Sequence, residues 1–252
     1  MNPEARRSFL TLAGASTLLA ACRNDARIYP EPAPPTSPRP LTADAKERKE
    51  TEDEAREVGA TEDLMREHGV IRRILVVYRL SATRLRSEPA TVPLDAIQRA
   101  AKLIHSFGED YHEKELEEAH LFPAVQAAGG AAAAEVPLLL EQHRRGREIT
   151  DYILVATQKP ITAVAAPLAR VLDSFALMYE EHAAREDTIV FPAWKKALSP
   201  TQLDEMGERF EDIEHKTFGK DGFDDAVQQV TALEHALGLA PGALTAPPPP
   251  KF

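Results

Sequence analysis

Large apolar residues return every three or four positions along most of the chain, which is the spacing of one face of an α-helix. Over residues 61–86 this spacing predicts a first core helix, with Thr61 as its N-cap. It predicts a second helix over residues 94–127, a third over 131–157 and a fourth over 163–198. Alanine and leucine are abundant and runs of β-branched residues are rare, so the pattern favours helices over strands.

Glycine and proline mark the breaks between these helices. Pro89 and Pro93 follow the first helix, Gly129 and Gly130 follow the second, and Pro160 follows the third. Short breaks place consecutive helices side by side, so the first two form one hairpin and the last two another. The expected fold is therefore all-α, an antiparallel up-down-up-down four-helix bundle. Extra C-terminal helices are expected over residues 201–215 and 223–239.

Two stretches, one in the second predicted helix and one in the fourth, resemble each other. Both end in Phe-Pro-Ala, and both combine histidine with carboxylates. When they are aligned on Phe-Pro-Ala, Glu117 falls on Glu186 and Glu118 falls on Asp187. This correspondence indicates a loose internal duplication, in which the second and fourth helices play matching roles.

Each of the four predicted bundle helices carries one histidine on its inward face. These histidines are His68, His112, His143 and His182. Imidazole nitrogen is a ligand for Fe, Zn, Cu and Ni, and carboxylates such as Glu117 and Glu186 favour harder ions and can bridge two of them. Because structural zinc is almost always four-coordinate, so large a ligand set suits a dinuclear iron centre better than a mononuclear zinc site.

The spacing within the second helix is irregular. In the fourth helix, His182 and Glu186 are four residues apart, so both side chains point from one face of the helix. His112 and Glu117 are five residues apart, and a π-bulge would bring them to one face. Glu113 and Glu115 are the alternative carboxylate ligands on this helix.

Other metal-binding patterns are not met. Ferritin-like di-iron proteins need Glu-x-x-His on two helices, and the fourth helix has Tyr179 where that glutamate would stand. Zinc proteases need His-Glu-x-x-His, and Leu116 rather than a histidine completes the stretch that begins at His112. The remaining histidines are expected to pack or to face solvent: His105, His120, His215 and His235.

The charge balance is acidic, with 30 Lys and Arg against 40 Asp and Glu, and no basic block stands out. Nucleic acid is therefore not an expected partner, because nucleic-acid-binding domains carry clustered positive charge.

The first 22 residues have the features of an export signal. Arg6 and Arg7 precede Ser-Phe-Leu as in a twin-arginine signal, and the apolar run that follows is too short to span a bilayer. Leu-Ala-Ala-Cys ends this run, so Cys22 is the expected lipidation site. We therefore expect a lipoprotein that is exported and held by a membrane lipid anchor in the bacterial cell envelope, on the periplasmic or outer-membrane side.

Proline content predicts the remaining domain boundaries. Residues 23–45 are expected to be a proline-rich linker, and residues 241–252 a disordered proline-rich tail. Residues 46–240 are expected to hold the bundle and the C-terminal helices.

Taken together, the motifs make the chain similar to the hemerythrin family, in particular to bacterial hemerythrin-like HHE cation-binding domains. The resemblance covers about residues 61–239. It implies a four-helix bundle around a non-haem di-iron centre with two iron ions. The motifs that carry it are Glu67-His68, Asp110-Tyr-His-Glu-Lys, Glu141-Gln-His143, His182-Ala-Ala-Arg-Glu186 and the two Phe-Pro-Ala sequences. The implied terminal ligands are His68, His112, His143 and His182, and the implied bridging ligands are Glu117 and Glu186.

The resemblance implies a protein that binds O2 or NO, or that senses redox state or iron. The alternatives are a di-iron oxidoreductase that consumes peroxide or acts as a ferroxidase, and a structural bundle with a zinc-filled or vestigial site. Oxygen carriers of the family have a second histidine one turn after the third-helix histidine, and Arg147 stands at that place here. This departure argues against simple reversible oxygen carriage.

Overall fold

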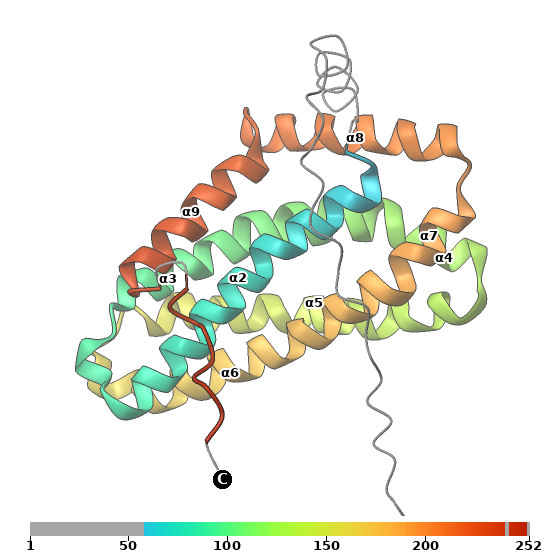
Figure 1. Ribbon diagram of the computed structural model, residues 1–252. Helices are drawn as coiled ribbons and strands as arrows, with labels where there is room; N and C mark the ends of the chain where they lie inside the picture. Colours follow the sequence, from blue (N-terminus) through green and yellow to red (C-terminus); the bar gives the residue numbers. More distant parts are fainter. Residues whose placement is uncertain (1–57, 240–241, 251–252) are drawn as a thin grey trace, which may run out of the picture. The chain divides into compact units, whose positions relative to one another are not determined.

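The computed structural model describes residues 58–239 and 242–250 of the chain. Within these ranges the chain forms helices and their connections, and no strand (Figure 1). The all-α prediction is confirmed. The predicted export signal of residues 1–22 with Cys22, the linker of residues 23–45 and the expected start of the domain at residue 46 lie outside the described residues.

The first bundle helix is α2, Ala60–Ser87. Its buried face includes Leu64, Ile71 and Leu75, which the apolar spacing predicts. The predicted N-cap at Thr61 is wrong, because Gly59 holds the extended backbone that precedes the helix and Thr61 lies already inside the first turn. No side chain caps this end, and Glu62 and Asp63 of the first turn instead complement the positive end of the helix dipole.

The second bundle helix is continuous and has three parts. It follows a short 3-10 turn, η1 (Pro89–Thr91), and consists of α3 (Leu94–Leu103), η2 (Ile104–Leu121) and α4 (Phe122–Ala128). The segment η2 is a π-helix, which is unusual because π-helical structure mostly occurs as single turns. Gly129, with φ of 74°, ends the helix in a conformation that favours glycine.

The third and fourth bundle helices form the second hairpin. The third is α5, Gly130–Ala156, and the fourth consists of α6 (Ile161–Arg185), η3 (Glu186–Val190) and α7 (Phe191–Ala197). By length and composition alone, the stretch Ile161–Ala197 is apolar enough to cross a membrane. It contributes Leu168 and Phe175 to the bundle core, so its apolar character is also that of a core helix.

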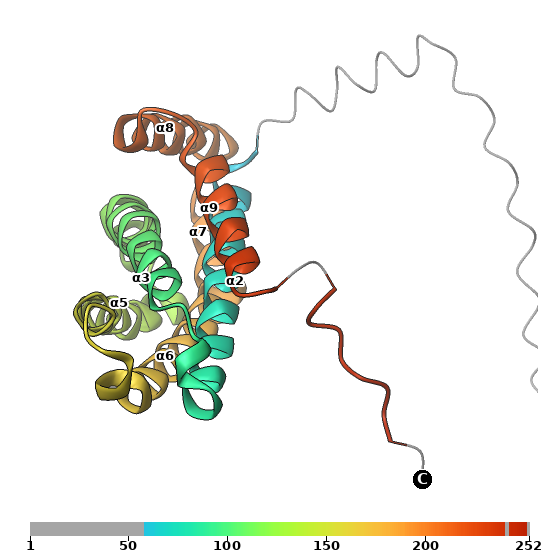
Figure 2. The same cartoon turned by 90° about the vertical axis from the view of Figure 1, so that its left-hand side faces the viewer.

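The four bundle helices surround one apolar core. In Figure 2, α2, α6, α5 and α3 follow one another around the bundle, and the same neighbours are in contact. Two further helices, α8 (Pro200–Phe218) and α9 (Gly222–Ala236), cover the side formed by α2 and the α3–η2 helix. Ser199 begins α8 with a capping box that it completes with Gln202. The antiparallel bundle with extra C-terminal helices is thus confirmed.

Candidate metal centre

Four histidines from the four bundle helices meet inside the bundle. His68 lies on α2, His112 on η2, His143 on α5 and His182 on α6, and each is at most 3% exposed. The ring centres of His68 and His112 are 4.8 Å apart, and those of His143 and His182 are also 4.8 Å apart. The cluster therefore consists of two histidine pairs, which we name the α2/η2 half (His68 and His112) and the α5/α6 half (His143 and His182).

Glu117 lies between the two halves. Its Oε1 is 3.3 Å from His112 Nε2, and its Oε2 is 3.4 Å from His143 Nε2. The carboxylate thus faces one imidazole from each half, and the whole side chain is buried.

Glu186 lies between the other two imidazoles. Its Oε2 is 3.1 Å from His182 Nε2 and 3.4 Å from His68 Nε2. The six residues predicted as ligands are therefore together in one buried cluster, with four Nε2 atoms and two carboxylates directed at its centre.

The π-helix explains how His112 and Glu117 share a face. In η2 each turn contains more residues than in an α-helix, because hydrogen bonds join residues five apart. This places Glu117 at the Nε2 side of His112 despite the extra residue between them. Of the two alternative carboxylates, Glu115 is exposed, and Glu113 lies on the Nδ1 side of His143 at 3.8 Å. The geometry thus favours Glu117.

Each imidazole is fixed by an acceptor at its Nδ1 atom. His68 is paired with Asp187 at 2.8 Å, His112 with Glu67 at 2.5 Å, His143 with Glu118 at 2.9 Å and His182 with Gln142 at 3.0 Å. An imidazole that donates from Nδ1 in its neutral form presents Nε2 as a lone pair. This arrangement is typical of histidine ligands, whose second nitrogen is usually hydrogen-bonded so that the ring and its tautomer are fixed.

These partner residues repeat the internal duplication. Glu118 and Asp187, which correspond in the aligned sequences, both accept from a histidine of another helix. Phe122 stacks on His143 with ring centres 5.5 Å apart, and Phe191 stacks on His68 at 5.2 Å. We did not predict the partners at Nδ1, although the alignment of the two Phe-Pro-Ala stretches contained the signal for two of them.

Arg147 stands where the family's oxygen carriers have a further histidine, and it binds carboxylates. Its Nη2 donates to Glu113 Oε2 at 3.1 Å and to Glu118 Oε1 at 2.6 Å. The hydroxyl of Tyr179 donates to the other oxygen of Glu113 at 2.6 Å. Glu113 is therefore engaged by Arg147 and Tyr179 beside the cluster.

The buried groups shift one another's protonation. Burial opposes ionisation of Glu117, but the neighbouring imidazoles of His112 and His143 outweigh this effect and hold its pKa well below the usual value. Burial likewise acts to lower the pKa of His143, but Glu113, Glu117 and Glu118 raise it to about 10. The pKa values of His68 and His112 are raised as well, so without a cation protons on these imidazoles balance the carboxylates. A metal ion that enters must displace these protons.

The centre of the cluster contains polar atoms without hydrogen bonds. Among the described residues, none forms a hydrogen bond with His112 Nε2 or with any carboxylate oxygen of Glu117 and Glu186. Buried polar atoms are nearly always satisfied, so their convergence needs a partner. A metal cation fits this donor set of imidazole nitrogen and carboxylate oxygen.

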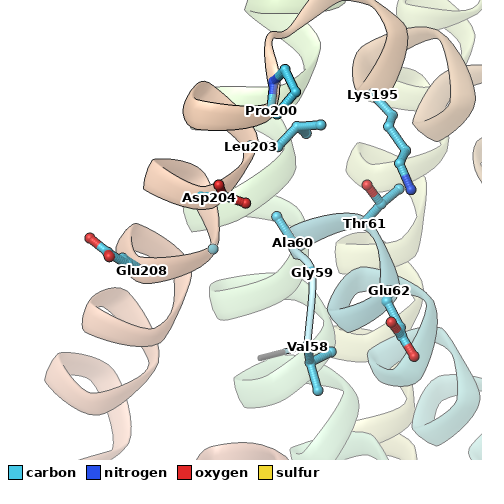
Figure 3. Close-up of a pocket in the computed structure, with 11 residues that line it drawn as sticks. Val58, Gly59, Ala60, Thr61, Glu62, Lys195, Pro200, Leu203, Asp204 and Glu208 are labelled. Atoms are coloured by element: carbon cyan, nitrogen blue, oxygen red, sulfur yellow. The ribbon is translucent and has the colours of Figure 1, made fainter. Parts of the chain in front are cut away.

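A hollow at the protein surface lies away from this cluster. A groove of about 360 Å³ separates the start of α2 from α8, and Pro200 and Leu203 face Ala60 across it (Figure 3). Lys195 extends toward Thr61 at one end of the groove. None of the six clustered residues lines this groove, so we place the functional site in the bundle interior.

The fold and the buried cluster together define a helical-bundle protein that can hold a metal cation. The family model for the hemerythrin HHE cation-binding domain matches residues 59–194, and the chain belongs to this family.

Similar proteins occur in mycobacteria. The uncharacterized protein Mb2018 of Mycobacterium bovis and the uncharacterized protein Rv1995 of Mycobacterium tuberculosis are each 42% identical to the chain over 189 residues. The match covers 72% of this chain and 71% of each relative. No solved structure matches the chain significantly.

Proposed function

We propose that the cluster holds a non-haem di-iron centre and that the protein binds O2 or NO, or senses redox state, at this centre. His68 and His112 would be the terminal ligands of one iron, and His143 and His182 those of the other. The observation that carries the proposal is the set of four converging Nε2 atoms around two buried carboxylates whose oxygens have no hydrogen-bond partner among the described residues.

The two carboxylates suit a bridging role because each faces both halves. Glu117 directs one oxygen to each half, and carboxylates can bridge two hard cations. Six ligands shared by two ions leave coordination positions for a small molecule, which is the requirement for binding O2 or NO. When bound, the iron pair would supply the redox chemistry.

The residues of the chain would control protons and water at this centre. Phe122 and Phe191 stack on His143 and His68 and exclude water from these rings. The buried Tyr179 hydroxyl donates to Glu113, and the Tyr179 ring centre is 5.4 Å from that of His182 in the α5/α6 half. This hydroxyl favours a second candidate function, a peroxide-consuming oxidoreductase, because reduction of peroxide to water consumes protons.

The test is metal analysis with an optical spectrum after anaerobic loading with Fe(II) and exposure to O2. We expect two iron ions per chain and an absorption band of an oxo-bridged iron pair. His182→Ala should lose this band, whereas His215→Ala, a matched change of an exposed histidine on α8, should keep it. A colourless protein that retains zinc or no metal after iron loading would overturn the proposal. Peroxide turnover that rises in proportion to iron content would favour the oxidoreductase.

A further inference from the structure

The two halves of the cluster differ in the groups that accept from their Nδ1 atoms. In the α2/η2 half both acceptors are carboxylates, Asp187 at 2.8 Å and Glu67 at 2.5 Å. In the α5/α6 half they are Glu118 at 2.9 Å and the amide of Gln142 at 3.0 Å. Hydrogen bonds to ionised acceptors are shorter and about twice as strong as neutral ones, and the distances follow this order.

The orientation of the Gln142 amide is fixed by a second contact. Its Nε2 donates to Glu181 Oε2 at 3.1 Å, and an ionised carboxylate can only accept. Gln142 Oε1 must therefore face His182 Nδ1. A neutral carbonyl thus occupies the place where the matching residue of the first hairpin, Glu67, presents a negative charge.

The carboxylate of the α5/α6 half is also weakened as an acceptor. Glu118 Oε1 accepts from both His143 Nδ1 and Arg147 Nη2, so one oxygen is shared between an imidazole and a guanidinium. Asp187 also pairs with a guanidinium, that of Arg72, but through its other oxygen, Oδ2, so its Oδ1 is left to His68. Glu67 has the opposite situation: its Oε2 pairs with His112, and its buried Oε1 has no hydrogen-bond partner in the part of the chain that the structure describes. His112 is therefore the one side-chain hydrogen-bond partner of Glu67 among the described residues.

A carboxylate at the outer nitrogen of a histidine ligand raises the basicity of the ligating nitrogen, and loss of such a partner typically lowers metal affinity about 10- to 100-fold. We infer that the two cation positions are inequivalent: the α2/η2 half binds the first cation tightly, and the α5/α6 half binds a second, more weakly held and more exchangeable one, with Glu67 and Gln142 as the positioning residues that set the difference. This inference rests on the proposed dinuclear centre.

The two positions share Glu117 and Glu186, so stepwise binding alone would not identify which position fills first. The experiment therefore measures occupancy. The metal-free full-length chain receives one equivalent of Co²⁺, is crystallised, and anomalous scattering gives the Co²⁺ occupancy beside each histidine pair. We expect an occupancy ratio of about 10 or more in favour of His68 and His112.

Two isosteric exchanges test the cause. Glu67→Gln should lower the affinity for the first Co²⁺ about 10- to 100-fold, and Gln142→Glu should raise the affinity for the second about 10-fold, both measured by titration of the Co²⁺ absorption. In the double variant the preferred position should move to His143 and His182. Gln158→Glu, the same exchange at an exposed position near the end of α5, should change neither affinity.

Equal or reversed occupancy in the unchanged chain would overturn the inference, and so would a preference that the double variant leaves in place. In each of these outcomes Co²⁺ still binds within the cluster and the titration still shows two binding steps, so the dinuclear centre stays intact. Absence of Co²⁺ from the cluster would instead overturn the proposed function itself. If circular dichroism shows that Glu67→Gln unfolds, Gln142→Glu still tests the inference. Its affinity for the second Co²⁺ should rise, and the Co²⁺ occupancy beside His143 and His182 should rise with it.

Discussion

The α2/η2 half and the α5/α6 half present the same ligand atoms but have different surroundings. Behind His68 and His112 stand two carboxylates, with Phe191 stacked on His68. Behind His143 and His182 lies a broader buried network that includes Glu113 and Tyr179. The two hairpins thus repeat the ligands but differ in the neighbouring residues. Glu67 precedes His68 in the first hairpin, whereas Gln142 precedes His143 in the second. A site that is nearly symmetric in its ligands can be asymmetric in its chemistry.

The largest effect is expected where the halves are joined. Glu117→Ala removes the one carboxylate that directs an oxygen to each half, so we expect loss of both cations, at least about a 100-fold fall in Co²⁺ affinity. Isothermal titration measures this affinity. Glu115→Ala, a change of an exposed residue on the same helix, is the matched control and should bind as the unchanged chain does. Retention of one tightly bound cation in Glu117→Ala would show that the halves bind independently.

The sequence was sufficient to predict the bundle and the six clustered residues. Helix breaks such as Gly129 and Pro160 were visible as residue types, and the helices end within a few residues of the predicted positions. The inward histidines followed from helical spacing. The extra residue between His112 and Glu117 required a π-helical segment, which the structure contains.

Other features could not be predicted because they depend on contacts between helices. Glu67 and Gln142 directly precede two of the histidines and therefore point away from them along their own helices, and each serves a histidine of a neighbouring helix. From the sequence, Arg147 was notable only because it replaces a histidine of the family's oxygen carriers. Its role as a donor to Glu113 and Glu118 could not be predicted, because these carboxylates lie on another helix, η2. The error at Thr61 arose because a capping preference of residue type does not decide which residue of Gly-Ala-Thr leaves the helical conformation.

The buried network behind the α5/α6 half predicts a pH effect on stability. Glu109 accepts from Thr150 Oγ1 at 2.5 Å, and its burial raises its pKa to about 8. The folded protein therefore holds a proton that the unfolded chain releases near pH 4.5. The stability associated with this proton is complete below that pH and is lost as the pH rises toward about 8.

Glu109→Gln should remove this dependence. We expect the metal-free variant to gain up to about 3 kcal/mol relative to the unchanged chain between pH 5 and pH 8, measured by urea unfolding at both values. Glu115→Gln, which changes an exposed carboxylate of the same helix, should leave the pH dependence as it is. If the free energy of unfolding changes with pH equally in Glu109→Gln and in the unchanged chain, Glu109 is not the group responsible for the pH dependence.

Gly146 makes room for the network on one side of the bundle. A Cβ atom built at this position would lie 2.0 Å from the Tyr179 hydroxyl, which is buried and bonded to Glu113. Gly146→Ala should therefore lower the free energy of unfolding by about 2 kcal/mol, through overpacking and the displaced hydrogen bond. Gly69, next to His68 on α2, has no atom within 4 Å of its Cβ position. Gly69→Ala should be neutral or stabilise by about 0.5 kcal/mol, and equal losses in both variants would refute the distinction.

The smallest expected difference in stability concerns two arginines that bind carboxylates beside the cluster, Arg147 and Arg72. Arg147 donates to Glu113, which is only 2% exposed, whereas Arg72 binds Asp187 and is itself 42% exposed. Arg147→Gln leaves a buried carboxylate with Tyr179 as its remaining side-chain donor, so a loss of about 1–2 kcal/mol is expected. Arg72→Gln breaks a pair near the surface and should cost about 0.5 kcal/mol or less. Urea unfolding of both variants at neutral pH measures the difference. A larger loss for Arg72→Gln would mean that the α2/η2 half, rather than the α5/α6 half, depends on a guanidinium to keep its carboxylate ionised.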